Sequence, residues 1–185
     1  MELERGKYMN WQKINWPVIF IGIILTFAAA SSSYFFWQQY AVAKPVTQAV
    51  GEISGVEKVV IDSKNQIIPK VHVTLINVDN LEVAYQAIND ALTGSLGSSK
   101  YKLILHDHRT PELEQLYYTI HYYVYEGIST GKFSDMSEKI QEKAIAANTK
   151  AHVYIDSNNI YLQLTTTNGD LYQVIPREPD SKGVR

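Results

Sequence analysis

The longest apolar pattern in the chain lies near its N-terminus. Residues 17–40 contain no charged side chain, and Trp16 and Trp37 stand close to the two ends of this stretch. At a rise of about 1.5 Å per residue, the 21 steps between the two tryptophans span about 31 Å. The hydrocarbon core of a bilayer is about 30 Å thick, and aromatic rings favour its two interfaces. The pattern predicts a transmembrane helix over residues 17–40, preceded by a short arm over residues 1–16.

Basic residues are unequally distributed around the predicted span. Three of them precede it and only Lys44 follows it closely. Because Lys and Arg favour the cytoplasmic side, we expect a single-pass protein of the cell membrane with a cytoplasmic N-terminus and an extracytoplasmic C-terminal domain. A cleaved signal peptide is the alternative, since Ala28–Ala30 fits a small-residue cleavage site. The basic residues before the span are Arg5, Lys7 and Lys13.

After the span, the chain changes to short alternating and helical patterns. We predict a linker over residues 41–54, an α+β domain over residues 55–176 and a flexible tail over residues 177–185. The pair Asn168-Gly169 favours a tight hairpin near the end of the domain. The order β-β-α-β-α-α-β-β-β predicts one mainly antiparallel sheet with about three helices. The expected strands are 55–62, 67–76, 101–105, 152–156, 160–167 and 171–175, and the expected helices are 81–92, 111–129 and 135–148.

Composition and motifs exclude several classes of function. The chain has 185 residues, 17 basic and 19 acidic, so its net charge of -2 argues against a nucleic-acid partner. The absence of cysteine excludes disulfides, a thiol nucleophile and iron–sulfur clusters. No Gly-x-Ser-x-Gly elbow and no recognisable cofactor motif is present. We therefore expect no cofactor and no catalysis by the chain itself.

The pattern GVEKVVIDSKNQIIPKVHVTL followed by AYQAINDAL covers residues 55–92. It resembles the small ββα units of BON domains and of the ring-building modules of the bacterial envelope. The resemblance rests on Gly55-Val56 and on the spacing of the apolar residues. It implies a binding or assembly role and provides no functional residue for this chain.

The sequence His106-Asp107-His108 is the one local cluster that a metal could use. Residues two apart on a strand share a face, so His106 and His108 could point the same way, and Glu112 could supply a third ligand. This would suit a metal-dependent membrane-bound enzyme. The alternative is a polar loop in which Asp107 and Arg109 organise the start of the next helix.

Tyrosines form a second pattern on the predicted helix 111–129. Tyr118, Tyr122 and Tyr125 follow the i, i+4, i+7 spacing of one helical face. The stripe is either packed inside the domain or exposed as a contact surface for a protein partner or for self-association. Together with the predicted lipid contact of residues 17–40, it favours a membrane-anchored interaction or assembly module. An extracytoplasmic ligand-sensing or ligand-binding domain is the alternative.

Overall fold

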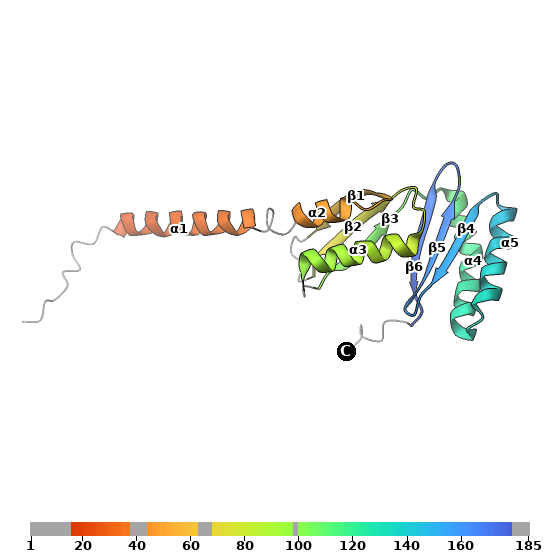
Figure 1. Cartoon of the computed structure of the whole chain (residues 1–185). Helices are drawn as coiled ribbons and strands as arrows, with labels where there is room; N and C mark the ends of the chain where they lie inside the picture. The colour runs from red at the N-terminus through yellow and green to blue at the C-terminus, as the bar shows by residue number, and fades with distance from the viewer. Residues whose placement is uncertain (1–15, 38–43, 63–67, 98–99, 179–185) are drawn as a thin grey trace, which may run out of the picture. The chain divides into compact units, whose positions relative to one another are not determined.

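The computed structural model describes residues 16–37, 44–62, 68–97 and 100–178 (Figure 1). The chain divides into two compact units, residues 1–42 and 43–185. Apart from Trp16, Arg177 and Glu178, the predicted arm over 1–16 and the predicted tail over 177–185 lie outside the described residues.

Helix α1 (Trp16–Trp37) forms where the sequence predicted a transmembrane helix. However, none of the helices in the described part of the chain is sufficiently long and apolar to cross a membrane. The prediction of a transmembrane helix over residues 17–40 is corrected accordingly.

The second unit begins with a three-stranded sheet and two helices. The strand order is β1-β2-β3, with β1 antiparallel and β3 parallel to β2. Helix α3 is the crossover that the parallel pair requires. Alternate residues of β2, namely Val71, Val73 and Leu75, are fully buried in one core with residues of α2 and α3. The elements are α2 (Lys44–Gly51), β1 (Val56–Asp62), β2 (Lys70–Leu75), α3 (Leu81–Leu96) and β3 (Lys102–His106).

Helix α2 lies in the segment that the sequence assigned to a linker. Its residues Val46 and Val50 share one face and are fully buried, and the helix packs against α3 and β1. Residues 44–51 are therefore part of the folded unit. The helix was not predicted from the sequence because two apolar valines in eight residues do not establish a helical period.

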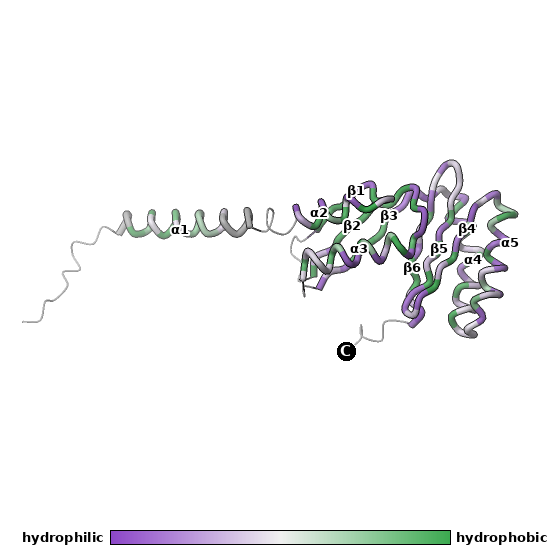
Figure 2. The backbone as a smooth tube through the Cα atoms, in the orientation of Figure 1, coloured by the Kyte–Doolittle hydropathy of each residue, from purple (hydrophilic) through white to green (hydrophobic). Residues whose placement is uncertain are grey.

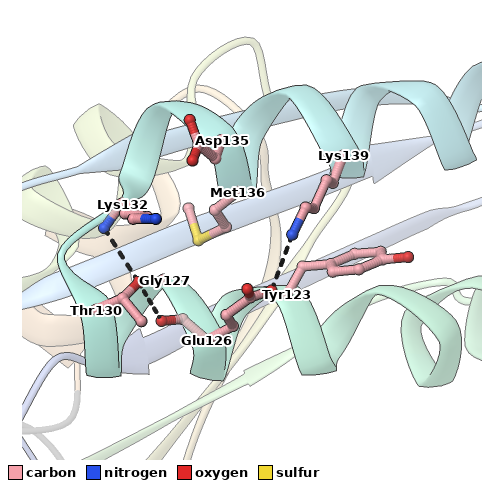
Figure 3. A pocket seen from close by; sticks show the side chains of 8 residues that line it. All are labelled: Tyr123, Glu126, Gly127, Thr130, Lys132, Asp135, Met136 and Lys139. Atoms are coloured by element: carbon pink, nitrogen blue, oxygen red, sulfur yellow. Dashed lines mark hydrogen bonds and ion pairs between the residues drawn. The ribbon is translucent and has the colours of Figure 1, made fainter.

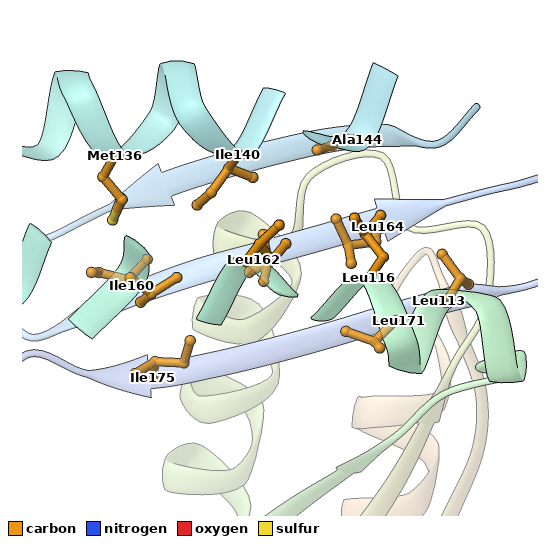
Figure 4. Packing of buried hydrophobic residues seen from close by; sticks show 13 residues of the cluster. Leu113, Leu116, Met136, Ile140, Ala144, Ile160, Leu162, Leu164, Leu171 and Ile175 are labelled. Atoms are coloured by element: carbon orange, nitrogen blue, oxygen red, sulfur yellow. The ribbon is translucent and has the colours of Figure 1, made fainter. Parts of the chain in front are cut away.

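Two helices and an antiparallel meander follow. Helices α4 (Pro111–Thr130) and α5 (Phe133–Ala146) cover one face of the sheet β4 (Lys150–Ile155), β5 (Asn159–Thr165) and β6 (Asp170–Pro176). Hydrophobic and hydrophilic residues alternate along both helices (Figure 2), as expected where only one face of a helix is buried. Figure 4 shows Leu162 and Leu164 of β5 in the same buried cluster as Leu116 of α4 and Ile140 of α5.

The opposite face of this second sheet packs against the first half of the unit. Tyr161 and Tyr172 belong to the core that contains α2, α3 and β2. The ring of Tyr161 lies 5.6 Å from that of Tyr85 on α3. Both faces of β5 are thus covered, and residues 160–164 are all buried.

The α+β class is confirmed, and the strands and helices from β1 onward follow the predicted order. The prediction of a single mainly antiparallel sheet is wrong, because the described residues form two three-stranded sheets, one of them mixed. They also form five helices, whereas the sequence predicted the helix over residues 17–40 and about three more; the second unit contains four, α2 to α5. Element order alone could not distinguish these arrangements, since β3 could have joined either neighbouring pair of strands.

Candidate functional site

Helix α4 presents the surface that the sequence identified. The Thr110 hydroxyl accepts a hydrogen bond from the Leu113 N–H at 3.4 Å, and Pro111 occupies the first turn. Gly131 adopts a left-handed conformation and ends the helix. The buried positions of α4, which fix the direction of its outer face, are Leu113, Leu116, Ile120, Val124 and Gly127.

Tyr118, Tyr122 and Tyr125 lie on the side of α4 opposite to these buried residues. They are 56%, 69% and 57% exposed, so the stripe is a surface feature and not part of a core. The ring of His121 lies between them, with its centroid 3.9 Å from that of Tyr122 and 6.2 Å from that of Tyr125. We call Tyr118, His121, Tyr122 and Tyr125 the aromatic face of α4.

The charged residues of α4 that surround the aromatic face are all acidic. Helix α4 carries Glu112, Glu114 and Glu126 and has neither Lys nor Arg. Glu126 forms an ion pair with Lys139 of α5 at 3.0 Å. The surface thus combines apolar rings and hydroxyl groups with an acidic border.

The structure separates the three residues considered as metal ligands. His106 ends β3, and its Nε2 lies 2.8 Å from Nδ1 of His72 on the neighbouring strand β2. His108 lies beyond the strand, where the alternation of faces no longer applies, and its Nε2 lies 2.6 Å from Glu57 Oε2. Glu112 is at the start of α4, where a hydrogen bond with Thr110 lowers the pKa of its carboxyl. Among the described residues, no group of three or more His, Asp or Glu could hold a metal ion.

Asp107 has a structural role between β3 and β6. Its side chain is only 4% exposed and receives two hydrogen bonds from Arg109, at 2.7 and 2.8 Å. It also accepts a hydrogen bond from the Tyr172 N–H at 3.0 Å. The sequence predicted that Asp107 and Arg109 organise the loop before α4, but not that Asp107 reaches the last strand.

A small cavity of about 110 Å³ lies between α4 and α5 (Figure 3). Its wall includes the ion pair between Lys139 and Glu126, and the Lys139 ammonium also lies 5.3 Å from the centre of the Tyr123 ring. Gly127 allows the close approach of α5, because a Cβ at this position would lie 2.7 Å from Met136 Sδ. Glu126 and Lys139 are paired with each other, so we assign the cavity to helix packing.

A larger cleft of about 270 Å³ lies beside the turn that joins β2 to α3. Its floor contains Gln163 of β5 and Asp170 of β6, each only 4% exposed. Gln163 Oε1 and Asp170 Oδ1 are buried and have no hydrogen-bond partner. Lys150 and His152 of β4 form an exposed part of the lining. We call this the polar cleft.

Burial also affects the tyrosines beside the floor of the polar cleft. Burial raises the pKa of Tyr172, and the negative charge of Asp170 adds to this effect, whereas the Val78 N–H donates to the Tyr172 hydroxyl at 3.1 Å and opposes it. Burial and the hydrogen bond to Asp156 raise the pKa of Tyr161 to about 12. Both phenols therefore stay neutral at physiological pH and act as hydrogen-bonding groups.

Sequence reasoning missed the polar cleft because its residues come from four elements. The available signal was Gln163, a polar residue between Leu162 and Leu164 in an otherwise apolar strand. No protein-family model, curated protein or solved structure matches the chain.

Proposed function

We propose that residues 43–185 are an interaction or assembly module without catalysis of its own, which binds through the aromatic face of α4. The observation that carries the proposal is the exposure of three tyrosines, each more than half exposed, on a well-capped helix. The partner is a protein surface or a second copy of the chain. The predicted location outside a cell membrane depended on the corrected span, and the proposal is made without it.

The physical chemistry of the aromatic face supports a contact role. Tyr rings bury a large apolar area, while their hydroxyl groups stay hydrated until a partner arrives. Tyr is enriched among the residues that contribute most to the free energy of binding at protein interfaces. Because Glu114 borders the rings and α4 contains neither Lys nor Arg, a partner with basic or hydrogen-bond-donating groups complements this face.

The proposal is tested by substituting Tyr122, the most exposed ring of the three, with Ser. We expect the melting temperature to stay within about 1 °C, because an exposed side chain contributes little to folding. Association should weaken by about 1 to 3 kcal/mol, as for a residue central to an interface. Self-association is measured by analytical ultracentrifugation, and partner binding by co-purification under native conditions followed by titration with the partner identified.

Val83→Ser is the matched control. Val83 is 61% exposed on α3, away from the aromatic face, so its substitution removes exposed apolar area without touching α4. It should leave both self-association and partner binding unchanged. If Tyr122→Ser lowers the melting temperature by several degrees while association stays normal, the aromatic face is a packing feature and the proposal fails.

A further inference from the structure

We propose that the polar cleft binds a small zwitterion, an α-amino acid or a similar carboxylic acid that carries an amine. The site lies on the second sheet and on the turn from β2 to α3, away from the residues of the aromatic face. The inference is independent of the proposed interaction surface, and either one can fail without the other.

The register of the second sheet places the polar side chains of the cleft in two rows that run across the strands. In one row, Thr165 of β5 lies between Lys150 of β4 and Asp170 of β6. In the adjacent row, Gln163 of β5 pairs with His152 of β4. Residues two apart on a strand share a face, so both rows point to the same side of the sheet. The cleft therefore has a basic edge on β4 and an acidic edge on β6.

The two unpartnered oxygens on the floor are fixed as acceptors. The Gln163 Nε2 donates to the Val78 carbonyl at 2.6 Å, and turning the amide over would bring two acceptor oxygens together, so Oε1 must face away from Val78. Asp170 Oδ2 accepts from the Asn77 N–H at 3.3 Å, and Asp170 also interacts with the Tyr172 hydroxyl, while Oδ1 itself has no hydrogen-bond partner. Buried acceptors without donors are unfavourable and rare in folded proteins.

These acceptors define the chemistry that would complete the site. An ammonium group offers several N–H donors and a positive charge, which suit the amide oxygen of Gln163 and the carboxylate of Asp170. A carboxylate on the same molecule suits the ammonium of Lys150 at the opposite edge. A volume of about 270 Å³ is slightly below the usual range for sites of drug-sized ligands, as expected for a molecule of amino-acid size.

The turn between β2 and α3 contains a residue with a left-handed backbone conformation. Asn77 has a positive φ of 50°, in the left-handed region that residues other than glycine seldom adopt. Its N–H donates to Asp170, so the turn and the acidic edge are joined directly. Gln163 Oε1 and Asp170 Oδ1 are shielded from solvent in this structure, so side chains of the lining must move to admit the ammonium group.

The test is a titration of the full-length protein, labelled with ¹⁵N, with each of the twenty common L-amino acids. At least one of them should give saturable shifts of the Gln163 side-chain amide and of the Asn77 backbone amide. With alanine as the probe, ethylamine and propionate carry the two charged groups separately. Each of them should bind at least about tenfold more weakly than alanine. If no amino acid gives saturable shifts, or if propionate alone matches alanine, the assignment is overturned.

Variants of the two edges locate the binding. Lys150→Met changes an exposed residue and Asp170→Asn keeps the shape of the side chain, and each should weaken binding of the amino acid by about tenfold. Asp170→Asn should not lower the melting temperature, because it removes a buried carboxylate oxygen that has no partner. Wild-type affinity in both variants would overturn the assignment.

Substitution of Gln163 has its own control. Gln163→Leu should abolish the saturable shift of Asn77, and Gln141→Leu should not. Gln141 also donates to a backbone carbonyl, that of Ala151 at 2.6 Å, but it does not line the polar cleft. If Gln163→Leu does not fold, Lys150→Met decides the question.

Discussion

Gly169 packs against the carbonyl oxygen of His108, and a Cβ built on Gly169 would overlap with that oxygen. The same oxygen accepts a hydrogen bond from the Asp170 N–H at 3.2 Å. The turn between β5 and β6 is thus joined to the loop between β3 and α4. This contact explains why a glycine occupies position 169.

Gly169→Ala should destabilise the protein by about 1 to 3 kcal/mol, as expected for a side chain forced into a filled space. The free energy of unfolding is measured by urea denaturation. Gly94→Ala is the control, since Gly94 lies in α3, no atom lies within 4 Å of the place that a Cβ would occupy, and Ala favours a helix by about 0.5 to 1 kcal/mol relative to Gly. Equal stability of the wild type and Gly169→Ala would contradict the contact.

The sequence located this turn but indicated a different reason for its glycine. Asn168-Gly169 predicted a two-residue hairpin turn, which requires positive φ angles. In the structure, residues 166–169 connect β5 and β6, and the glycines with positive φ in the described chain are Gly55, Gly97 and Gly131. The requirement at Gly169 comes from His108, 61 positions earlier in the chain, and no local pattern contains that information.

Asp107→Ala should reduce the free energy of unfolding by about 2 to 4 kcal/mol. The substitution leaves the Arg109 guanidinium without its partner and removes the acceptor of the Tyr172 N–H. Glu142→Ala is the matched control, because the pair between Glu142 and Lys143 spans 3.7 Å at the surface and should contribute at most about 0.5 kcal/mol. Both variants are compared in urea. Similar losses in the two would show that Asp107 does not connect β3 with β6.

The pair between His108 and Glu57 makes the ionisation of His108 sensitive to a single substitution. The hydrogen bond to Glu57 and the charge of Glu57 raise the pKa of His108 above its ordinary value. Because the pKa is higher in the folded state, the stabilisation is fully present below the unfolded pKa of about 6.5 and is lost as the pH rises through the folded value.

Glu57→Gln should therefore lower the pKa of His108, as measured by NMR titration of its imidazole. Glu142→Gln, at the surface of α5, is the control and should leave the pKa of His108 unchanged. The difference in melting temperature between the wild type and Glu57→Gln should decrease as the pH rises through the folded pKa of His108. An unchanged pKa of His108 in the variant would contradict the pair.

The two candidate sites were unequally accessible to sequence reasoning. The aromatic face lies on one helix, so the spacing of Tyr118, Tyr122 and Tyr125 was sufficient to place them together. The polar cleft depends on strand register, which sets Gln163 of β5 diagonally to Asp170 of β6. The pairing of His106 with His72 likewise depends on the parallel contact between β2 and β3. Such contacts between distant segments are set by packing and not by local periodicity.

Helix α2 contributes two buried valines to the core of the second unit. Residues 43–185 should unfold cooperatively with the melting temperature of the full-length chain, because the core that contains Val46 and Val50 is complete in this fragment. A fragment that begins at Glu52 lacks α2 and exposes the parts of α3 and β1 that α2 covers. The loss of two fully buried valines should cost about 3 to 6 kcal/mol.

Such a loss is a large part of the stability of a typical domain, which is about 5 to 15 kcal/mol. The fragment 52–185 should therefore melt at a much lower temperature or without a cooperative transition, as followed by circular dichroism. In the full-length chain, Val50→Ala should cost about 1 to 3 kcal/mol, whereas Gln48→Ala, on the exposed side of α2, should cost less than about 0.5 kcal/mol. If fragments 43–185 and 52–185 melt alike, α2 does not contribute to the core, and the folded unit begins at β1.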